Sequence, residues 1–163
     1  MKPIVILGPT ASGKSSLAMA LATSDAGRDL GIELLSIDAM QVYRGMDIGT
    51  AKPTAAERAA VRHHCIDLVD PTDDFTVAKF KEAHRRALDD IASREGRALL
   101  VGGTGLYHRV VIDDFDLPGE WPDVRASLES RDLADLYAHL GGLDAAAAAK
   151  IEPENRRRVV RAL

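Results

Sequence analysis

The sequence contains little cysteine and no long apolar run. Cys65 is its one cysteine among 163 residues, which excludes an internal disulfide framework and suits a reducing cytosol. No apolar run approaches the roughly 20 residues that cross a bilayer. The first apolar run, Ile4 to Leu7, is also shorter than a signal-peptide core. We therefore predict a cytoplasmic protein without a membrane segment.

Aromatic residues and positive charge are also scarce. Aromatics make up 4% of the chain, too few for a platform that stacks extended single-stranded nucleic acid. Lys and Arg number 21 against 25 Asp and Glu, and the net charge of −4 argues mildly against a dedicated nucleic-acid binder. Hydrophobic residues make up 46% and charged residues 28%, which is typical of a globular protein of about one domain.

The first 112 residues alternate between apolar strands and helical segments. Strands are predicted at residues 3–7, 33–37, 65–69 and 98–101. Helices are predicted at residues 13–23, 54–62, about 77–95 and 106–112, with Thr54 and Thr76 as caps. Residues 25–31 read as a polar connection. Strands that are apolar throughout predict an α/β fold, a parallel sheet with helices on both faces, over a core domain at residues 1–115.

After residue 115 the pattern changes to a linker followed by helices only. The predicted helices cover residues 122–131, 132–140 and 144–151, and Asn155 can cap a last one. Residues 116–163 are therefore predicted to form a separate helical segment that follows residues 1–115 and is inserted in the core domain. The last helix reaches Leu163 without a terminating residue, and four strands is a small sheet. We expect both domains to be truncated, with the C-terminal part of the core absent.

The first strand leads into a phosphate-binding motif. Residues 8–15 fit the pattern G-x-x-x-x-G-K-[ST] between a strand and a helix, the context that the P-loop NTPase fold requires. Backbone N–H groups and the helix N-terminus would face a phosphate group, Lys14 would add a point charge, and Ser15 would ligate Mg²⁺. The residues predicted to bind phosphate or diphosphate are Gly8, Pro9, Thr10, Ala11, Ser12, Gly13, Lys14 and Ser15. Such a motif is common to nucleotide- and ATP-binding proteins, and it does not identify the ligand.

Asp38 follows the second predicted strand, at the edge of the sheet where ligands of open α/β folds bind. A carboxylate there has three possible roles. It can act as a general base, it can hold Mg²⁺ indirectly, or it can simply cap the turn that follows. The residue alone does not distinguish among these roles.

Three stretches together resemble the tRNA dimethylallyltransferases, also called tRNA isopentenyltransferases. These stretches are the phosphate loop at 8–15, the segment 38–53 that contains Gly-Met-Asp-Ile-Gly-Thr-Ala-Lys-Pro, and Val-Gly-Gly-Thr-Gly-Leu-Tyr at 101–107. Their order and separation also match, and the similarity continues through residues 122–125 and 155–163. The phosphate loop occurs in many unrelated proteins, whereas the second stretch is specific.

The resemblance implies transfer of a dimethylallyl group from its diphosphate to N6 of the adenosine 3′ of a tRNA anticodon. The phosphate loop, Lys14 and Mg²⁺ would neutralise the leaving diphosphate. Asp38 would be the general base, and Thr104 would contact the substrates near the reacting centre. Asp38, Lys14 and Thr104 are therefore the predicted catalytic residues. ATP is not consumed in this chemistry.

The resemblance also implies contacts with the tRNA anticodon stem-loop, and Gln41 would hydrogen-bond the target base. The predicted tRNA-binding residues are Asp38, Ala39, Met40, Gln41, Thr104, Arg125, Arg157, Arg158, Val159, Val160 and Arg161. Residues 156–161 include four arginines, so the net charge of the whole chain is a poor guide to its partner. The expected partners are tRNA and dimethylallyl diphosphate, with no membrane, and a monomer is favoured.

Two other functions compete with this one. A small P-loop kinase would use Asp38 to orient an acceptor hydroxyl, although the sequence shows no Arg-rich lid after the fourth strand. Alternatively, the chain is a fragment that binds diphosphate and tRNA without turnover.

Overall fold

The computed structural model describes residues 2–103, 105–113, 115 and 121–163. They belong to two compact units, Met1–Leu117 and Pro118–Leu163. The predicted boundary between 115 and 116, most of the predicted linker, and Thr104 lie outside the described residues.

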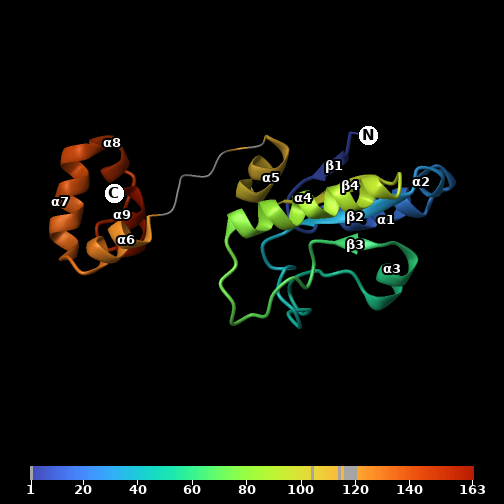
Figure 1. Ribbon diagram of the computed structural model, residues 1–163, viewed down its shortest axis with the longest axis horizontal. Coiled ribbons are helices and arrows are strands. Elements are labelled where there is room, and N and C mark those ends of the chain that lie inside the picture. The colour runs from blue at the N-terminus through green and yellow to red at the C-terminus, as the bar shows by residue number, and fades with distance from the viewer. Residues whose placement is uncertain (1, 104, 114, 116–120) are drawn as a thin grey trace. The chain divides into compact units, whose positions relative to one another are not determined.

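The first unit is built on a parallel sheet of four strands (Figure 1). The strands are β1 (Ile4–Leu7), β2 (Ile32–Ile37), β3 (His63–His64) and β4 (Arg97–Gly102). Their order is β1-β4-β2-β3, and every pair is parallel. The predicted α/β class with a parallel sheet is confirmed.

The third strand was predicted wrongly. It was expected at residues 65–69, but β3 is His63–His64, which pairs with Leu34 and Leu35. Cys65 and Asp67 have φ values of 59° and 53°, in the left-handed region that interrupts a ladder. Cys65 is nevertheless buried, and burial raises the pKa of its thiol to about 12. The apolar residues after β3 are therefore packed in an ordered loop and not in a strand.

Five helices are described in this unit. They are α1 (Lys14–Thr23), α2 (Asp25–Asp29), α3 (Ala55–Ala60), α4 (Val77–Ser93) and α5 (Gly105–Ile112). The predicted caps are confirmed, because Thr54 forms a capping box with Glu57 and Thr76 accepts a hydrogen bond from the Lys79 N–H. Helix α2 was predicted as a connection, but Ser24 caps it by accepting from the Gly27 N–H at 3.1 Å.

Each face of the sheet has its own apolar core, as the alternation of side chains along a strand requires. One cluster joins α1 to the sheet through Ala18, Ala22, Ile32, Leu34 and Leu99. The other joins α4 and α5 to the opposite face through Leu35, Ile37, Phe80, Ile91, Leu100 and Tyr107. Helix α4 runs along the sheet in Figure 1. The predicted covering of both faces is confirmed.

The edge of the sheet at β1 is apolar and open in the part of the chain that the structure describes. There β1 pairs only with β4. Leu7 in β1 and Leu17 in α1 remain 45% and 59% exposed. Parallel sheets normally have covered faces and protected edges, so this edge is an exception within the unit.

His84 on α4 is buried, and its Nε2 has no hydrogen-bond partner among the described residues. Burial lowers the pKa of His84 from 6.5 to about 4. Between these pH values the unfolded chain binds a proton that the folded chain excludes. Stability therefore decreases as the pH decreases through this window, by at most about 3 kcal/mol.

We expect His84→Leu to reduce this loss of stability in acid. Urea unfolding at pH 7.5 and pH 4.5 measures the difference, with His139→Leu, at an exposed position, as the control. An unchanged difference between the two pH values in His84→Leu would assign the acid sensitivity to other groups.

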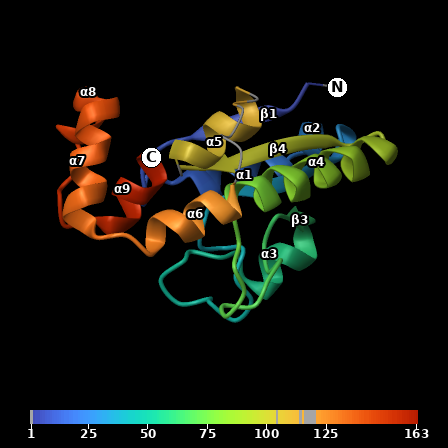
Figure 2. The same cartoon turned by 60° about the vertical axis from the view of Figure 1, so that its left-hand side comes forward.

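The second unit is a small helical bundle. It contains α6 (Pro122–Glu129), α7 (Leu133–Leu143), α8 (Ala145–Ala148) and α9 (Arg156–Ala162). Helix α7 packs against α8 and α9, and α9 also packs against α6 (Figure 2). The core of this unit consists of Leu136, Leu140, Ala148, Val159 and Val160. Over the described residues of both units, no helix has the length and hydrophobicity to span a bilayer.

Candidate active site at the carboxyl ends of the strands

Three adjacent strands end side by side. Leu7 of β1 and Ile37 of β2 both pair with Gly102 of β4, which lies between them. The next residues, Gly8, Gly103 and Asp38, therefore leave the sheet at one edge. The loops after β1 and β4 also touch, since a Cβ on Gly103 would lie 2.6 Å from the Gly8 carbonyl oxygen. The sheet thus brings the phosphate loop, the glycine loop and Asp38 together.

The phosphate loop connects β1 directly to α1. Ala11 and Gly13 take left-handed φ values of 63° and 82°, a conformation in which successive N–H groups can converge on an anion. The Lys14 ammonium donates to the Pro9 carbonyl oxygen at 2.6 Å, so the lysine folds back over the loop. A Cβ on Gly103 would be 3.9 Å from Lys14 Nζ, which places this charge between the loops after β1 and β4.

Ser15 is exposed in the first turn of α1, beside Lys14. Its hydroxyl can contribute one oxygen to a magnesium ion. No cluster of three acidic, histidine or cysteine side chains that could hold a metal occurs among the described residues. Mg²⁺ typically keeps several waters and binds through substrate phosphates and few protein oxygens, so a single hydroxyl beside a phosphate loop fits this ion.

The Asp38 carboxylate caps the turn that follows β2. Its Oδ1 accepts from the N–H groups of Met40 at 2.7 Å and Gln41 at 3.2 Å. The capping role is therefore present, while the roles in proton transfer and magnesium binding stay predictions. The pKa of Tyr107 is raised by burial and then by the nearby charges of Tyr43 and Asp38. Tyr107 thus lies close enough to this carboxylate for the two groups to interact electrostatically, a relation that the motif at 101–107 did not reveal.

Gln41, predicted to contact the target base, is engaged within the chain. Its Oε1 accepts from the Ser36 hydroxyl at 2.8 Å. Its Nε2 donates to the carbonyl oxygens of Thr50 and Ala51 at 3.1 and 3.0 Å. Both amide hydrogens are used, so Gln41 holds the loop at 39–53 against β2. Its contact with RNA stays a prediction.

Lys52 also anchors the loop at 39–53. The sequence analysis did not identify it as a site residue. Its side chain is 2% exposed, and Nζ donates to the Tyr43 carbonyl, to Asp47 at 3.1 Å and to Asp67 at 2.7 Å. Burial lowers the pKa of Lys52, but the hydrogen bonds and charges of Asp67 and Asp47 outweigh burial and raise it. Arg58 forms a second ion pair with Asp67. The one indication of this role in the sequence is that Lys52 lies in a segment rich in turn-forming residues.

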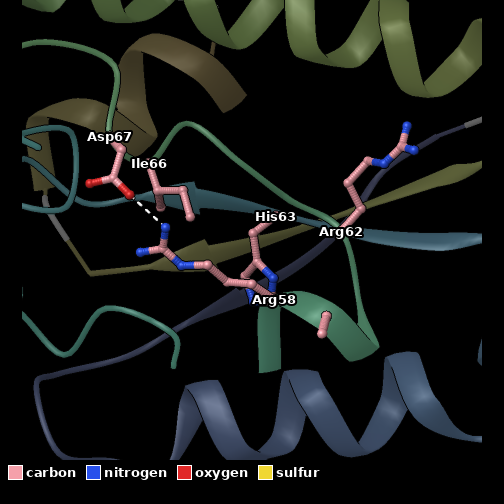
Figure 3. A pocket seen from close by; sticks show the side chains of 6 residues that line it. Arg58, Arg62, His63, Ile66 and Asp67 are labelled. Carbon is pink, nitrogen blue, oxygen red and sulfur yellow. Dashed lines mark hydrogen bonds and ion pairs between the residues drawn. The ribbon is translucent and has the colours of Figure 1, made fainter. Parts of the chain in front are cut away.

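An open hollow of about 510 Å³ lies elsewhere, at α3 and β3. Figure 3 shows Arg58 directed toward Asp67, whereas Arg62 extends in the opposite direction. Burial lowers the pKa of His63, which therefore favours its neutral form. None of the residues that line the hollow was predicted as a site residue, and β3 occupies the sheet edge remote from β1. We place the candidate site at the strand ends and not in this hollow.

The arginines of α9 divide into two groups by helical spacing. Arg157, Arg158 and Arg161 share the exposed side of the helix. Arg156 lies on the other side and donates to the carbonyl oxygens of Glu129 and Arg131 at 3.2 and 3.0 Å. Three arginines, and not four, thus form the exposed basic face of α9.

Val159 and Val160 occupy the buried side of α9. They were predicted to bind tRNA, and their side chains belong to the core of the second unit. Contact of these two residues with RNA stays a prediction. Arg125, on α6, pairs with Glu129 at 2.8 Å. Its role toward RNA stays a prediction.

Comparison with known proteins connects these features to a family. The model of the family described as IPP transferase matches residues 41–163. The chain is 49% identical to the tRNA dimethylallyltransferase of Bifidobacterium longum (strain NCC 2705), over 98% of this chain and 50% of that protein. It is 50% identical to the tRNA dimethylallyltransferase of Roseiflexus sp. (strain RS-1), over 98% of this chain and 53% of that protein.

Solved structures give the same result. The full-length tRNA isopentenylpyrophosphate transferase from Bacillus halodurans matches with a TM-score of 0.65 and 44% identity, over 99% of this chain and 54% of that one. A eukaryotic dimethylallyltransferase acting on tRNA matches with a TM-score of 0.76 and 30% identity, over 98% of this chain and 40% of that one. The chain spans about half the length of the curated relatives that it matches.

Proposed function

The chain belongs to the IPP transferase family, and we propose on this basis that the whole protein is a tRNA dimethylallyltransferase. It would transfer a dimethylallyl group from dimethylallyl diphosphate to N6 of the adenosine 3′ of the anticodon and release diphosphate. The observation that carries the proposal is the meeting of the phosphate loop, Gly103 and Asp38 at one edge of the sheet. A diphosphate site and a carboxylate side by side are what this reaction requires.

The phosphate loop would bind the leaving group. As the allylic C–O bond breaks, its electron pair remains on the diphosphate, and negative charge increases there. Lys14, which folds back over the loop, and the N–H groups at the start of α1 would stabilise that charge. Mg²⁺, held by Ser15, would supply further neutralisation of the same oxygens.

Asp38 would accept the proton. The lone pair of adenine N6 is delocalised into the ring, so the amine becomes nucleophilic as its proton is removed. The new bond joins N6 to the allylic carbon, and the N6 proton passes to the Asp38 carboxylate. The adenine must leave its stack to reach this edge of the sheet.

The tRNA would be held by both units. Arg157, Arg158 and Arg161 offer three guanidinium groups for backbone phosphates, and Arg125 is a further candidate. Asp38 to Gln41 would contact the target nucleotide, together with Thr104. We propose a monomeric protein that acts in the cytoplasm, where its substrate tRNA is found.

A transfer assay tests this proposal. The native protein is incubated with labelled dimethylallyl diphosphate and an anticodon stem-loop that carries the target adenosine, and in parallel with labelled ATP and candidate acceptors. We expect label on the RNA only. Label on a product of ATP, with none on the RNA, would indicate a kinase, and binding of both substrates without transfer would indicate a non-catalytic fragment.

A further inference from the structure

The loop that begins after Asp38 presents an isoleucine directly to solvent. Ile48 is 98% exposed, far more than Met40, which is 45% exposed on the same loop. A single exposed apolar residue needs no explanation in itself. Ile48 differs because the residues around it are tightly held.

The backbone on both sides of Ile48 has a fixed, turned conformation. Gly45 and Gly49 take φ values of 71° and 78°, which side chains with a Cβ rarely adopt. The Thr50 hydroxyl donates to the Met46 carbonyl oxygen at 2.6 Å and closes the turn that contains Ile48. The tip is therefore a defined structure.

Two sets of side-chain contacts fix this turn to the rest of the unit. Lys52 donates to Asp47, the residue before Ile48, and to Asp67 in the loop after β3. The Gln41 amide donates to the carbonyl oxygens of Thr50 and Ala51, two and three residues after the tip. The loop is thus preorganised, and it holds one apolar side chain away from the protein.

The position of the loop indicates what that side chain contacts. The Asp38 carboxylate accepts from the Gln41 N–H, and the Gln41 side chain donates to the Thr50 carbonyl oxygen, two residues after Ile48. These two hydrogen bonds connect the tip to the candidate site, and we therefore expect its occupant to be the RNA substrate that enters there. A protein partner is disfavoured, because a stable protein interface needs about 1,000 Å² or more of buried surface and a single tip supplies far less. A nucleobase is favoured, because inserting one apolar side chain beside an unstacked base is an established mode of nucleic-acid binding.

We propose that Ile48 packs against the face of a nucleobase next to the extruded adenine and so keeps the RNA loop unstacked. This inference rests on the proposed function. Ile48 would be a positioning residue, since it acts on the neighbours of the reacting base and not on the reacting atoms.

The experiment uses an anticodon stem-loop in which 2-aminopurine replaces the target adenosine, because the fluorescence of this base increases when it unstacks. Ile48→Ser is compared with the wild type, with Ile48→Leu, and with Leu30→Ser. Leu30 is 37% exposed and precedes β2, at the opposite end of the strand from Asp38.

At saturating protein we expect a fluorescence increase in the wild type, Ile48→Leu and Leu30→Ser, and a much smaller one in Ile48→Ser. In transfer assays Ile48→Ser should lower kcat/KM for the RNA by about tenfold, the scale of burying part of one aliphatic side chain. KM for dimethylallyl diphosphate and the Tm should not change.

The outcomes separate the two proposals. If the wild type transfers no dimethylallyl group, the proposed function fails, and this inference fails with it. If the wild type is active and Ile48→Ser matches it in fluorescence and in kcat/KM for the RNA, only the inference is overturned. A decrease in the Tm of Ile48→Ser would also overturn it, because the side chain would then be packing within the protein.

Discussion

Asp38→Asn is expected to lower the rate of dimethylallyl transfer by about 10²–10⁴-fold, the usual contribution of a general base. Asparagine keeps a side-chain oxygen that can accept from the N–H groups of Met40 and Gln41, so the turn after β2 should persist. It cannot take up the N6 proton. Binding of dimethylallyl diphosphate, measured by calorimetry, should stay close to that of the wild type because the phosphate loop is unchanged.

Comparison with Asp38→Ala separates proton transfer from capping. Alanine removes both the base and the cap, so it should lose activity at least as severely as asparagine. If Asp38→Asn retains full turnover while Asp38→Ala does not, the carboxylate acts by organising its loop, and the assignment of the base is wrong.

Lys52→Met is expected to destabilise the folded protein by about 3 kcal/mol, the scale of breaking a buried ion pair by removal of one partner. Methionine has a similar length but cannot donate, so the Tyr43 carbonyl and Asp67 would each lose a partner at a site where the lysine side chain is 2% and the aspartate 28% exposed. Urea unfolding measures the change. Lys79→Met, at an exposed lysine on α4, provides the control and should be nearly neutral.

A second variant shows whether the effect is electrostatic. Asp47 is largely exposed, so Asp47→Asn should cost far less than Lys52→Met. Equal effects of the two substitutions would mean that the buried pair with Asp67 is not the dominant interaction of Lys52.

Features that depend on short sequence separations were predictable. The capping box of Thr54 and Glu57, the Thr76 cap and the phosphate loop all join residues a few positions apart, so their spacing is visible in the sequence. Apart from α2 and the position of β3, the order of helices and strands followed from the same local patterns. The division of α9 into exposed arginines and buried valines also follows from the period of a helix, although the arginine run was first treated as one binding segment.

Features that depend on distant partners were not predictable. The segment at residues 65–69 is as apolar as a strand, but Leu68 and Val69 instead hydrogen-bond to Val42 in the loop after β2. Lys52 meets Asp67, and Gln41 meets Thr50, only once the chain has folded. These contacts determine the shape of the candidate site, whereas the sequence patterns show only which residues occupy it.

The open edge of β1 has a consequence for ligand binding. Gly8 follows β1 without any intervening residue, so the phosphate loop is only as rigid as the strand that carries it. Among the residues that the structure describes, β1 pairs with β4 alone, so β1 can fray, and each opening would also release the loop and expose its amide hydrogens to exchange with solvent. A polypeptide that pairs with the side of β1 away from β4 would slow that exchange and, without touching the diphosphate, increase the affinity for it.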